Sequence, residues 1–254
     1  MKDGADIRDL LKEWDYDPEN HVRIVPGKRG HDVLQVRLPL GIEQYELDGR
    51  PDGRRPHNKE SVLDFYLTRL EKAKSAGEED SYRLSPGECS ELFEEGVMYY
   101  CRYLHLFELK DWVRVARDTT RNLRLFDIIH TCAQRKEDRQ HLEQWRPYVL
   151  RMNAVACAML EVDQKAHDRG LRIIHEAIAQ IESLPAVDNQ TFRIEKERSI
   201  HALRETAEEI EKTRPLTELE TLERDLRQAV ETQEFERAAI LRDKLRALRD
   251  RVTS

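Results

Sequence analysis

Apolar residues near the C-terminal end of the chain recur at intervals of three and four, which places their side chains along one face of a helix. In the first run they are Leu219, Leu222, Leu226 and Ala229. In the second run they are Phe235, Ala238, Leu241, Leu245, Leu248 and Val252, with Ala239 beside them. Thr217 and Glu220 have the spacing of a capping box at the start of the first helix. The pattern predicts a hairpin of two amphipathic helices over residues 215–254.

Two helices of this length rarely bury both of their apolar stripes against each other, because a unit of about 40 residues seldom holds a core of its own. Covering Leu226, Phe235 and Leu245 with a third surface would contribute about 6 kcal/mol before ordering costs. That surface is either the chain's own core or another molecule. We expect another molecule.

The order of residues in this hairpin is similar to the UVR motif. The resemblance rests on Leu219-Glu220, Ala229, Phe235-Glu236, Ala238-Ala239, Leu241-Arg242-Asp243 and Leu245 to Leu248. In that family the hairpin links the excision-repair proteins UvrB and UvrC, and it also occurs in Clp chaperone subunits and in activators of protein-arginine kinases. The resemblance implies a protein-binding surface made of Leu219, Leu222, Leu226, Phe235, Ala238, Ala239, Leu241, Leu245 and Leu248.

Residues 1–80 show mixed patterns and are expected to form a small α+β module. A short amphipathic helix is predicted between Ile7 and Trp14. Alternation of apolar and polar residues predicts a β-hairpin, with strands near 22–25 and 34–40, and a further short strand near 42–47. Asp-Gly dipeptides and prolines between residues 48 and 57 predict a double turn, and a helix is expected over 58–74.

Residues 81–184 are expected to be helical. Ser85 and Glu88 form a second capping box, and four helices are predicted at 86–107, 110–133, 137–162 and 164–184. The turn at 106–111 matches the segment 159–164 in hydrophobic order, which indicates an internal repeat. Tightly joined helix pairs of this kind resemble tetratricopeptide (TPR) repeats, although an antiparallel bundle produces the same pattern.

A further helix is predicted at 191–212, either packed lightly on the helical body or extended as a coiled arm. The chain is therefore expected to be mainly α, with four parts. These are a small N-terminal module at 1–80, a TPR-like bundle at 81–184, a connecting helix at 185–214 and the UVR hairpin at 215–254.

Charge and composition narrow the choice of partners. The 254 residues include 43 Lys and Arg against 50 Asp and Glu, a net charge of −7, so direct binding to nucleic acid or to an anionic membrane is not expected. Met1–Asp6 carries acidic residues where a secretory signal carries basic ones, and the sequence has no apolar run of membrane-spanning length. We expect a cytoplasmic protein.

The cysteines and histidines do not show the spacing of a metal site. Cys89, Cys101, Cys132 and Cys157 lack CxxC clustering, so they are expected to be reduced core thiols. His105, His130, His167 and His175 are expected to be surface or satisfied core residues. No metal or other cofactor and no catalytic residue is predicted.

One loop concentrates cations in an otherwise acidic chain. Arg50, Arg54, Arg55 and His57 lie within eight residues, and arginine forks suit phosphate or carboxylate. An anion site is one interpretation. The other is that the arginines pair with neighbouring acids such as Asp48, Asp52 and Glu60.

Three functions follow from these observations. The favoured one is a non-enzymatic adaptor that uses the hairpin to bind either a protein partner or a second copy of itself. In the second case the protein forms a homodimer. The second, which rests on the resemblance, is an accessory factor of nucleotide excision repair that recruits repair proteins. The third, an enzyme, has no catalytic arrangement in the sequence to support it.

Overall fold

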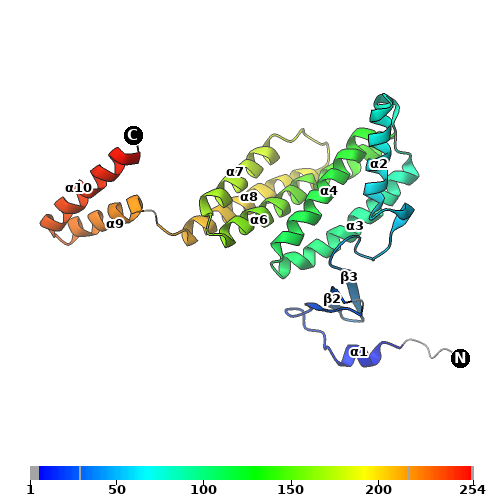
Figure 1. Cartoon of the computed structure of the whole chain (residues 1–254), viewed down its shortest axis with the longest axis horizontal. Helices are drawn as coiled ribbons and strands as arrows, with labels where there is room; N and C mark the ends of the chain where they lie inside the picture. The colour runs from blue at the N-terminus through cyan, green and yellow to red at the C-terminus, as the bar shows by residue number, and fades with distance from the viewer. Residues whose placement is uncertain (1–5, 29, 217, 253–254) are drawn as a thin grey trace. The chain divides into compact units, whose positions relative to one another are not determined.

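The computed structural model describes residues 6–28, 30–216 and 218–252 (Figure 1). The capping box predicted at Thr217 and the acidic start at Met1 to Ala5 lie outside these residues. The chain divides into two compact units, one ending at Glu208 and the other beginning at Glu209. The prediction of a mainly α fold with a small N-terminal sheet and a C-terminal helical hairpin is confirmed.

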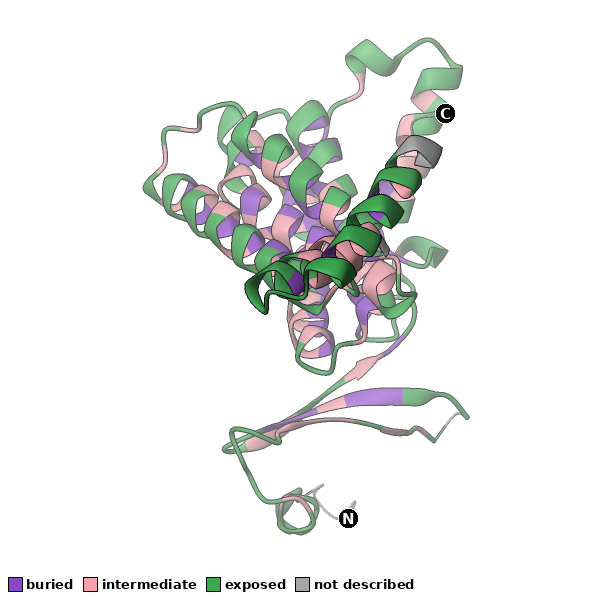
Figure 2. Ribbon diagram, turned by 90° about the vertical axis from the view of Figure 1, so that its left-hand side faces the viewer, coloured by how far each residue is buried: buried purple, intermediate pink, exposed green. Residues whose placement is uncertain are grey.

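The N-terminal segment contains helix α1 (Arg8–Lys12) and three strands, β1 (Val22–Pro26), β2 (Asp32–Leu38) and β3 (Gly41–Glu46). The strands form an antiparallel sheet in the order β1-β2-β3, with Val22 opposite Val36 and Leu34 opposite Tyr45. The central strand β2 is the most buried of the three (Figure 2). Leu34 packs with Leu106, Trp112 and other apolar residues of the helical body, so the sheet is attached through its middle strand.

The helical body begins with α2 (Val62–Ser75), whose N-terminus is capped by Ser61. It continues with α3 (Pro86–Glu108), α4 (Trp112–Cys132), α6 (Arg146–Asp163) and α7 (His167–Glu182), each of which packs against the next. Ser85 and Glu88 make the predicted capping box at α3. A large apolar core lies between α2, α3 and α4 and includes Leu63, Leu92, Leu125 and Ile129.

The single helix predicted over 137–162 is wrong. The structure has α5 (Lys136–His141), a 3-10 turn at Glu143–Trp145 and then α6. Pro147 is the second residue of α6, where a residue without an N–H group and with a fixed φ is accommodated at no cost to the hydrogen bonds of the helix. The same proline within a longer helix would remove a hydrogen bond and clash with the preceding turn.

The helices α3 and α6 end in similar turns, at positions shifted from the alignment predicted for an internal repeat, and the repeat itself stays a prediction. At the end of α3, Lys110 has a φ of 57°, Asp111 N–H donates to Leu106 O at 2.9 Å, and Lys110 N–H donates to Phe107 O at 3.0 Å. These two bonds define a Schellman motif. At the end of α6 the equivalent left-handed residue is Lys165, with a φ of 65°. Residues 106–111 therefore correspond to 161–166, not to 159–164.

Helix α8 (Gln190–Thr213) follows the body. Asn189 caps it, its Oδ1 accepting from Thr191 N–H at 2.7 Å. Phe192, Ser199 and Leu203 are buried, so the part of α8 that lies within the first unit packs on the helical body and is not an extended arm.

A buried polar network joins the N-terminal segment to the helices. The Arg102 guanidinium makes two bonds to the Asp118 carboxylate, at 2.7 and 2.9 Å, and its Nη1 donates to the carbonyls of Glu46 and Gly49. Both charged side chains are almost completely buried. The chain segment that follows β3 is thereby fixed against α3 and α4.

Glu95 supports the next segment of the chain. Its carboxylate accepts from the N–H groups of Val62 and Leu63, at 2.8 and 3.1 Å, at the start of α2. It also pairs with Arg121 and with Arg50. A carboxylate at a helix N-terminus satisfies amides that have no partner within the helix, so Glu95 links α2 to α3 and α4.

Candidate interaction surface in the C-terminal hairpin

The C-terminal hairpin consists of α9 (Glu218–Glu231) and α10 (Phe235–Val252), which pack against each other. The turn between them repeats the geometry found in the body. Gln233 has a φ of 60°, Glu234 N–H donates to Ala229 O at 2.8 Å, and Gln233 N–H donates to Val230 O at 3.1 Å. The prediction of two helices joined by a tight polar turn is confirmed.

The turn also fixes the start of α10 through Glu234. Its carboxylate accepts from Arg237 Nη1 at 3.0 Å and from Thr232 Oγ1 at 3.1 Å. These hydrogen bonds, that from Arg237 first, hold the pKa of Glu234 below its ordinary value. The carboxylate is therefore ionised at neutral pH, next to the positive end of the α10 dipole.

The two apolar stripes cover each other in part. Ala229, Ala238 and Leu245 are buried within the hairpin. The half-buried members of the stripes are Leu219, Leu222, Leu226, Leu241 and Leu248. The helices therefore cover part of both stripes, and the expectation that an outside surface covers the rest stays a prediction.

Other apolar residues of the hairpin remain exposed. Phe235 is 69% exposed, Ile240 58% and Val230 53%. Ala239 is also exposed. Phe235 and Ala239 belong to the predicted binding set, whereas Val230 and Ile240 lie outside the main stripe and were not part of it. We refer to Val230, Phe235, Ala239 and Ile240 as the exposed apolar set.

Charged side chains hold the open end of the hairpin together. Arg249 of α10 donates from Nη2 to the Glu223 carboxylate of α9 at 2.6 Å. Arg214 pairs with Glu220 at the start of α9. Both pairs are partly exposed, so each contributes at most about 1 kcal/mol, and the Arg249–Glu223 pair is the one of the two that joins α10 to α9.

The basic side chains of the predicted anion-binding group lie near acidic side chains. Arg50 Nε lies 3.3 Å from both Asp52 and Glu95, and only 15% of its side chain is exposed. Arg55 lies 3.4 Å from Glu60. Asp48 pairs instead with Arg117 of α4. The arrangement corresponds to the second interpretation of this loop, in which the arginines pair with neighbouring acids.

Two members of that group differ from the others. Arg54 is largely exposed, its Nε 3.8 Å from Asp52. His57 stacks on Phe65 of α2 with ring centroids 4.1 Å apart, and its Nε2 lies 3.5 Å from Glu91. A cavity of about 370 Å³ is lined by Arg50, Arg54 and Arg55, but also by Asp32, Glu46, Asp48 and Glu60. An anion site there stays a prediction.

The comparisons with known proteins identify one segment of the chain. Residues 217–251 match the family described as the UvrB/uvrC motif, which confirms the resemblance seen in the sequence and coincides with α9 and α10. Comparison of the chain with curated proteins and with solved structures gives no match. Among the described residues, none of the helices has both the length and the apolar composition that a membrane span needs.

Proposed function

We propose that this protein is a non-enzymatic adaptor whose C-terminal hairpin docks on a hairpin of the same kind, in the simplest case that of a second copy of the chain. The observation that carries the proposal is the exposure of Phe235, 69%, within a segment that matches the UvrB/uvrC motif. A large aromatic side chain left in water on a helical hairpin is typical of a contact residue.

Association through this set is expected to be weak. Completing the burial of Val230, Phe235 and Ile240 contributes about 1–2 kcal/mol for each side chain. Loss of translational and rotational freedom costs at least about 4 kcal/mol. A two-fold contact buries the exposed apolar set of both copies, so a small favourable free energy of association remains. We therefore expect dissociation constants in the micromolar range or weaker.

The test is light scattering on the full chain over a wide range of concentrations, with two matched variants. Phe235→Asp places a charge in the proposed contact and is expected to keep the protein at its monomer mass of 30.0 kDa. Leu40→Asp makes the same kind of change at a side chain that is 91% exposed in the N-terminal segment, and it should associate like the wild type. Equal masses for all three proteins at every concentration would contradict self-association.

A second candidate is an accessory role in nucleotide excision repair, in which the hairpin recruits repair proteins. The match to the UvrB/uvrC motif supports it. Titration of labelled full chain with a purified repair protein that carries this hairpin should then give saturable binding that Phe235→Asp abolishes and Leu40→Asp preserves. A monomeric wild type together with such binding would favour this role over self-association.

A further inference from the structure

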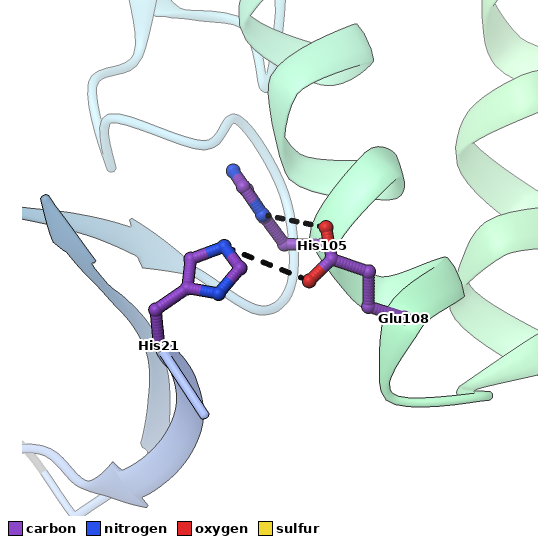
Figure 3. A group of neighbouring side chains, drawn as sticks. All are labelled: His21, His105 and Glu108. Atoms are coloured by element: carbon purple, nitrogen blue, oxygen red, sulfur yellow. Dashed lines mark ion pairs between the residues drawn. The ribbon is translucent and has the colours of Figure 1, made fainter. Parts of the chain in front are cut away.

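Three potential ligand groups meet where the N-terminal sheet approaches the end of α3. His21 immediately precedes β1, and His105 and Glu108 lie one turn apart in the last part of α3. Figure 3 shows both imidazole rings directed at the two oxygens of the Glu108 carboxylate. His21 Nε2 lies 3.7 Å from Oε2, and His105 Nδ1 lies 3.5 Å from Oε1.

These distances are too long for hydrogen bonds. The same protein contains a directly bonded pair for comparison, His31 Nε2 with Glu46 Oε2, at 2.6 Å. His105 Nδ1 is buried and makes no hydrogen bond at all. A buried ring nitrogen that faces a carboxylate without bonding to it is unsatisfied, and an unsatisfied buried polar atom needs a reason.

The spacing fits a single metal ion. The three ligand atoms lie within 4.8 Å of one another, and among the described residues this is the one place where three His, Cys, Asp or Glu side chains gather in that way. Tetrahedral zinc with bonds of about 2.0–2.1 Å holds its ligand atoms about 3.4 Å apart. The 3.5 and 3.7 Å separations are close to that value but end on different oxygens of the Glu108 carboxylate, so the Glu108 and His21 side chains would rotate to bring one oxygen and both nitrogens around the ion.

We propose that His21, His105 and Glu108 bind a divalent transition-metal ion, with Zn²⁺ the preferred occupant. Two imidazole nitrogens and one carboxylate oxygen suit Zn²⁺, whereas Mg²⁺ and Ca²⁺ select oxygen ligands. Three protein ligands leave a fourth position for water or another small ligand. Glu108 is 44% exposed and His21 23%, so an ion reaches the site from solvent.

The site would tie the sheet to the helical body. His21 lies in the N-terminal segment, and His105 and Glu108 lie in α3, so one ion adds a bridge between two parts of the fold that are also joined by an apolar cluster and by the Arg102 hydrogen bonds. An ion that binds the folded protein more tightly than the unfolded chain raises its thermal stability. Metal binding then has a readout that requires no knowledge of activity.

The experiment uses the full chain without a polyhistidine tag. The protein is incubated with Zn²⁺, desalted and analysed for bound metal by mass spectrometry, and its melting temperature is measured with Zn²⁺ and with EDTA. The wild type should retain one equivalent of Zn²⁺ and melt at a higher temperature with Zn²⁺ than with EDTA. Co²⁺ in place of Zn²⁺ should give the visible absorption of a four-coordinate ion.

The variants separate this site from general histidine binding. His21→Ala and Glu108→Gln should lower the affinity for Zn²⁺ by at least about tenfold and remove the melting shift. His31→Ala, which breaks a histidine–carboxylate pair without a third ligand, should bind like the wild type. Glu108→Gln keeps the size of a partly exposed side chain, so its circular dichroism should match the wild type. A wild type that retains no Zn²⁺, or His21→Ala and Glu108→Gln variants that bind it unchanged, would overturn the proposal.

Discussion

Arg102 and Asp118 form an ion pair within the helical body that is sealed from solvent, with exposures of 0% and 1%. Replacing Arg102 by Met leaves the buried Asp118 carboxylate with Arg117 alone and removes the Arg102 donor from the carbonyls of Glu46 and Gly49. Loss of one member of a buried pair costs about 3–5 kcal/mol. We therefore expect Arg102→Met to lower the free energy of unfolding by that amount, measured by urea denaturation with circular dichroism.

The control for this prediction is a pair of the same composition at the surface. Arg242 and Asp243 are both 68% exposed and lie 2.8 Å apart. Arg242→Ala should change the free energy of unfolding by less than about 0.5 kcal/mol. If both variants lose the same free energy of unfolding, the buried pair does not stabilise the protein more than a surface pair does.

The four cysteines differ in how well the structure protects them. Cys89 and Cys132 are buried, whereas Cys101 and Cys157 are half-buried, so the expectation of core thiols describes the first two better than the others. Burial raises the pKa of all four thiols, that of Cys89 to about 11. Because the thiolate is the reactive form, a raised pKa slows the reaction of all four thiols at neutral pH.

This arrangement predicts an order of alkylation by iodoacetamide in the native protein at pH 8. Cys101 and Cys157 should react slowly, and Cys89 and Cys132 should react only when denaturant is added. Peptide mass spectrometry after timed quenching measures each site. Burial of Cys89 both suppresses its ionisation and keeps the reagent away from its sulfur. Raising the pH towards 11 should therefore accelerate labelling of Cys89 only under conditions in which the protein also opens. Fast native labelling of Cys89 would contradict the packing of the core around it.

At the scale of elements, the three Schellman turns carry a residue other than glycine in the left-handed region. Lys110, Lys165 and Gln233 have φ values between 57° and 65°. A side chain in this region costs about 1 kcal/mol, which glycine avoids. Lys110→Gly and Lys165→Gly should each raise the free energy of unfolding, by up to about 1 kcal/mol, in urea titrations.

The matched control for these turns is the same substitution inside a helix. Lys72 lies within α2 in the ordinary right-handed conformation, and its side chain is exposed. There Lys72→Gly should lower the free energy of unfolding by about 1 kcal/mol. Opposite signs at Lys110 and Lys72 would establish that backbone conformation, not the loss of a lysine, decides the outcome.

The sequence predicted most of these elements because their signals are local. Apolar spacing, the Ser85–Glu88 capping box and the alternation along β2 each arise within a few residues and do not depend on distant packing. The break before α6 was missed although Pro147 marks it, because the surrounding residues kept helical spacing. The alignment of the internal repeat was wrong by two residues because hydrophobic order does not locate a left-handed residue.

The candidate sites were less predictable because they depend on contacts between distant segments. The sequence identifies Phe235 as a member of an apolar stripe, but only the packing of α9 on α10 shows that it stays exposed while Leu245 is buried. His21 and His105 are far apart in the chain, and nothing in their local sequence relates them. They meet because Leu34 and Leu47 attach the sheet to the end of α3.

At the scale of the whole molecule, the two units differ in the amount of core that protects their backbones. In the hairpin, only Ala229, Ala238 and Leu245 are buried among the residues whose side chains the structure describes. The first unit, by contrast, has extended apolar clusters. Amides exchange hydrogen through local opening, whose free energy follows the local burial. In dilute solution, amides of α9 and α10 should exchange much faster than those of α3 and α4.

Concentration then becomes a test of whether the hairpin is covered in solution. If a second copy shields the exposed apolar set, protection of α9 and α10 should increase with protein concentration, because binding adds to the free energy of opening. Hydrogen exchange at the amides of α3 and α4 should not change with concentration, because opening these helices costs far more free energy than a weak contact supplies. Hydrogen–deuterium exchange with mass spectrometry measures both regions in one experiment. The increase should vanish in Phe235→Asp and persist in Leu40→Asp, whereas equal exchange in all three proteins at every concentration would mean that the hairpin is not covered by its own kind.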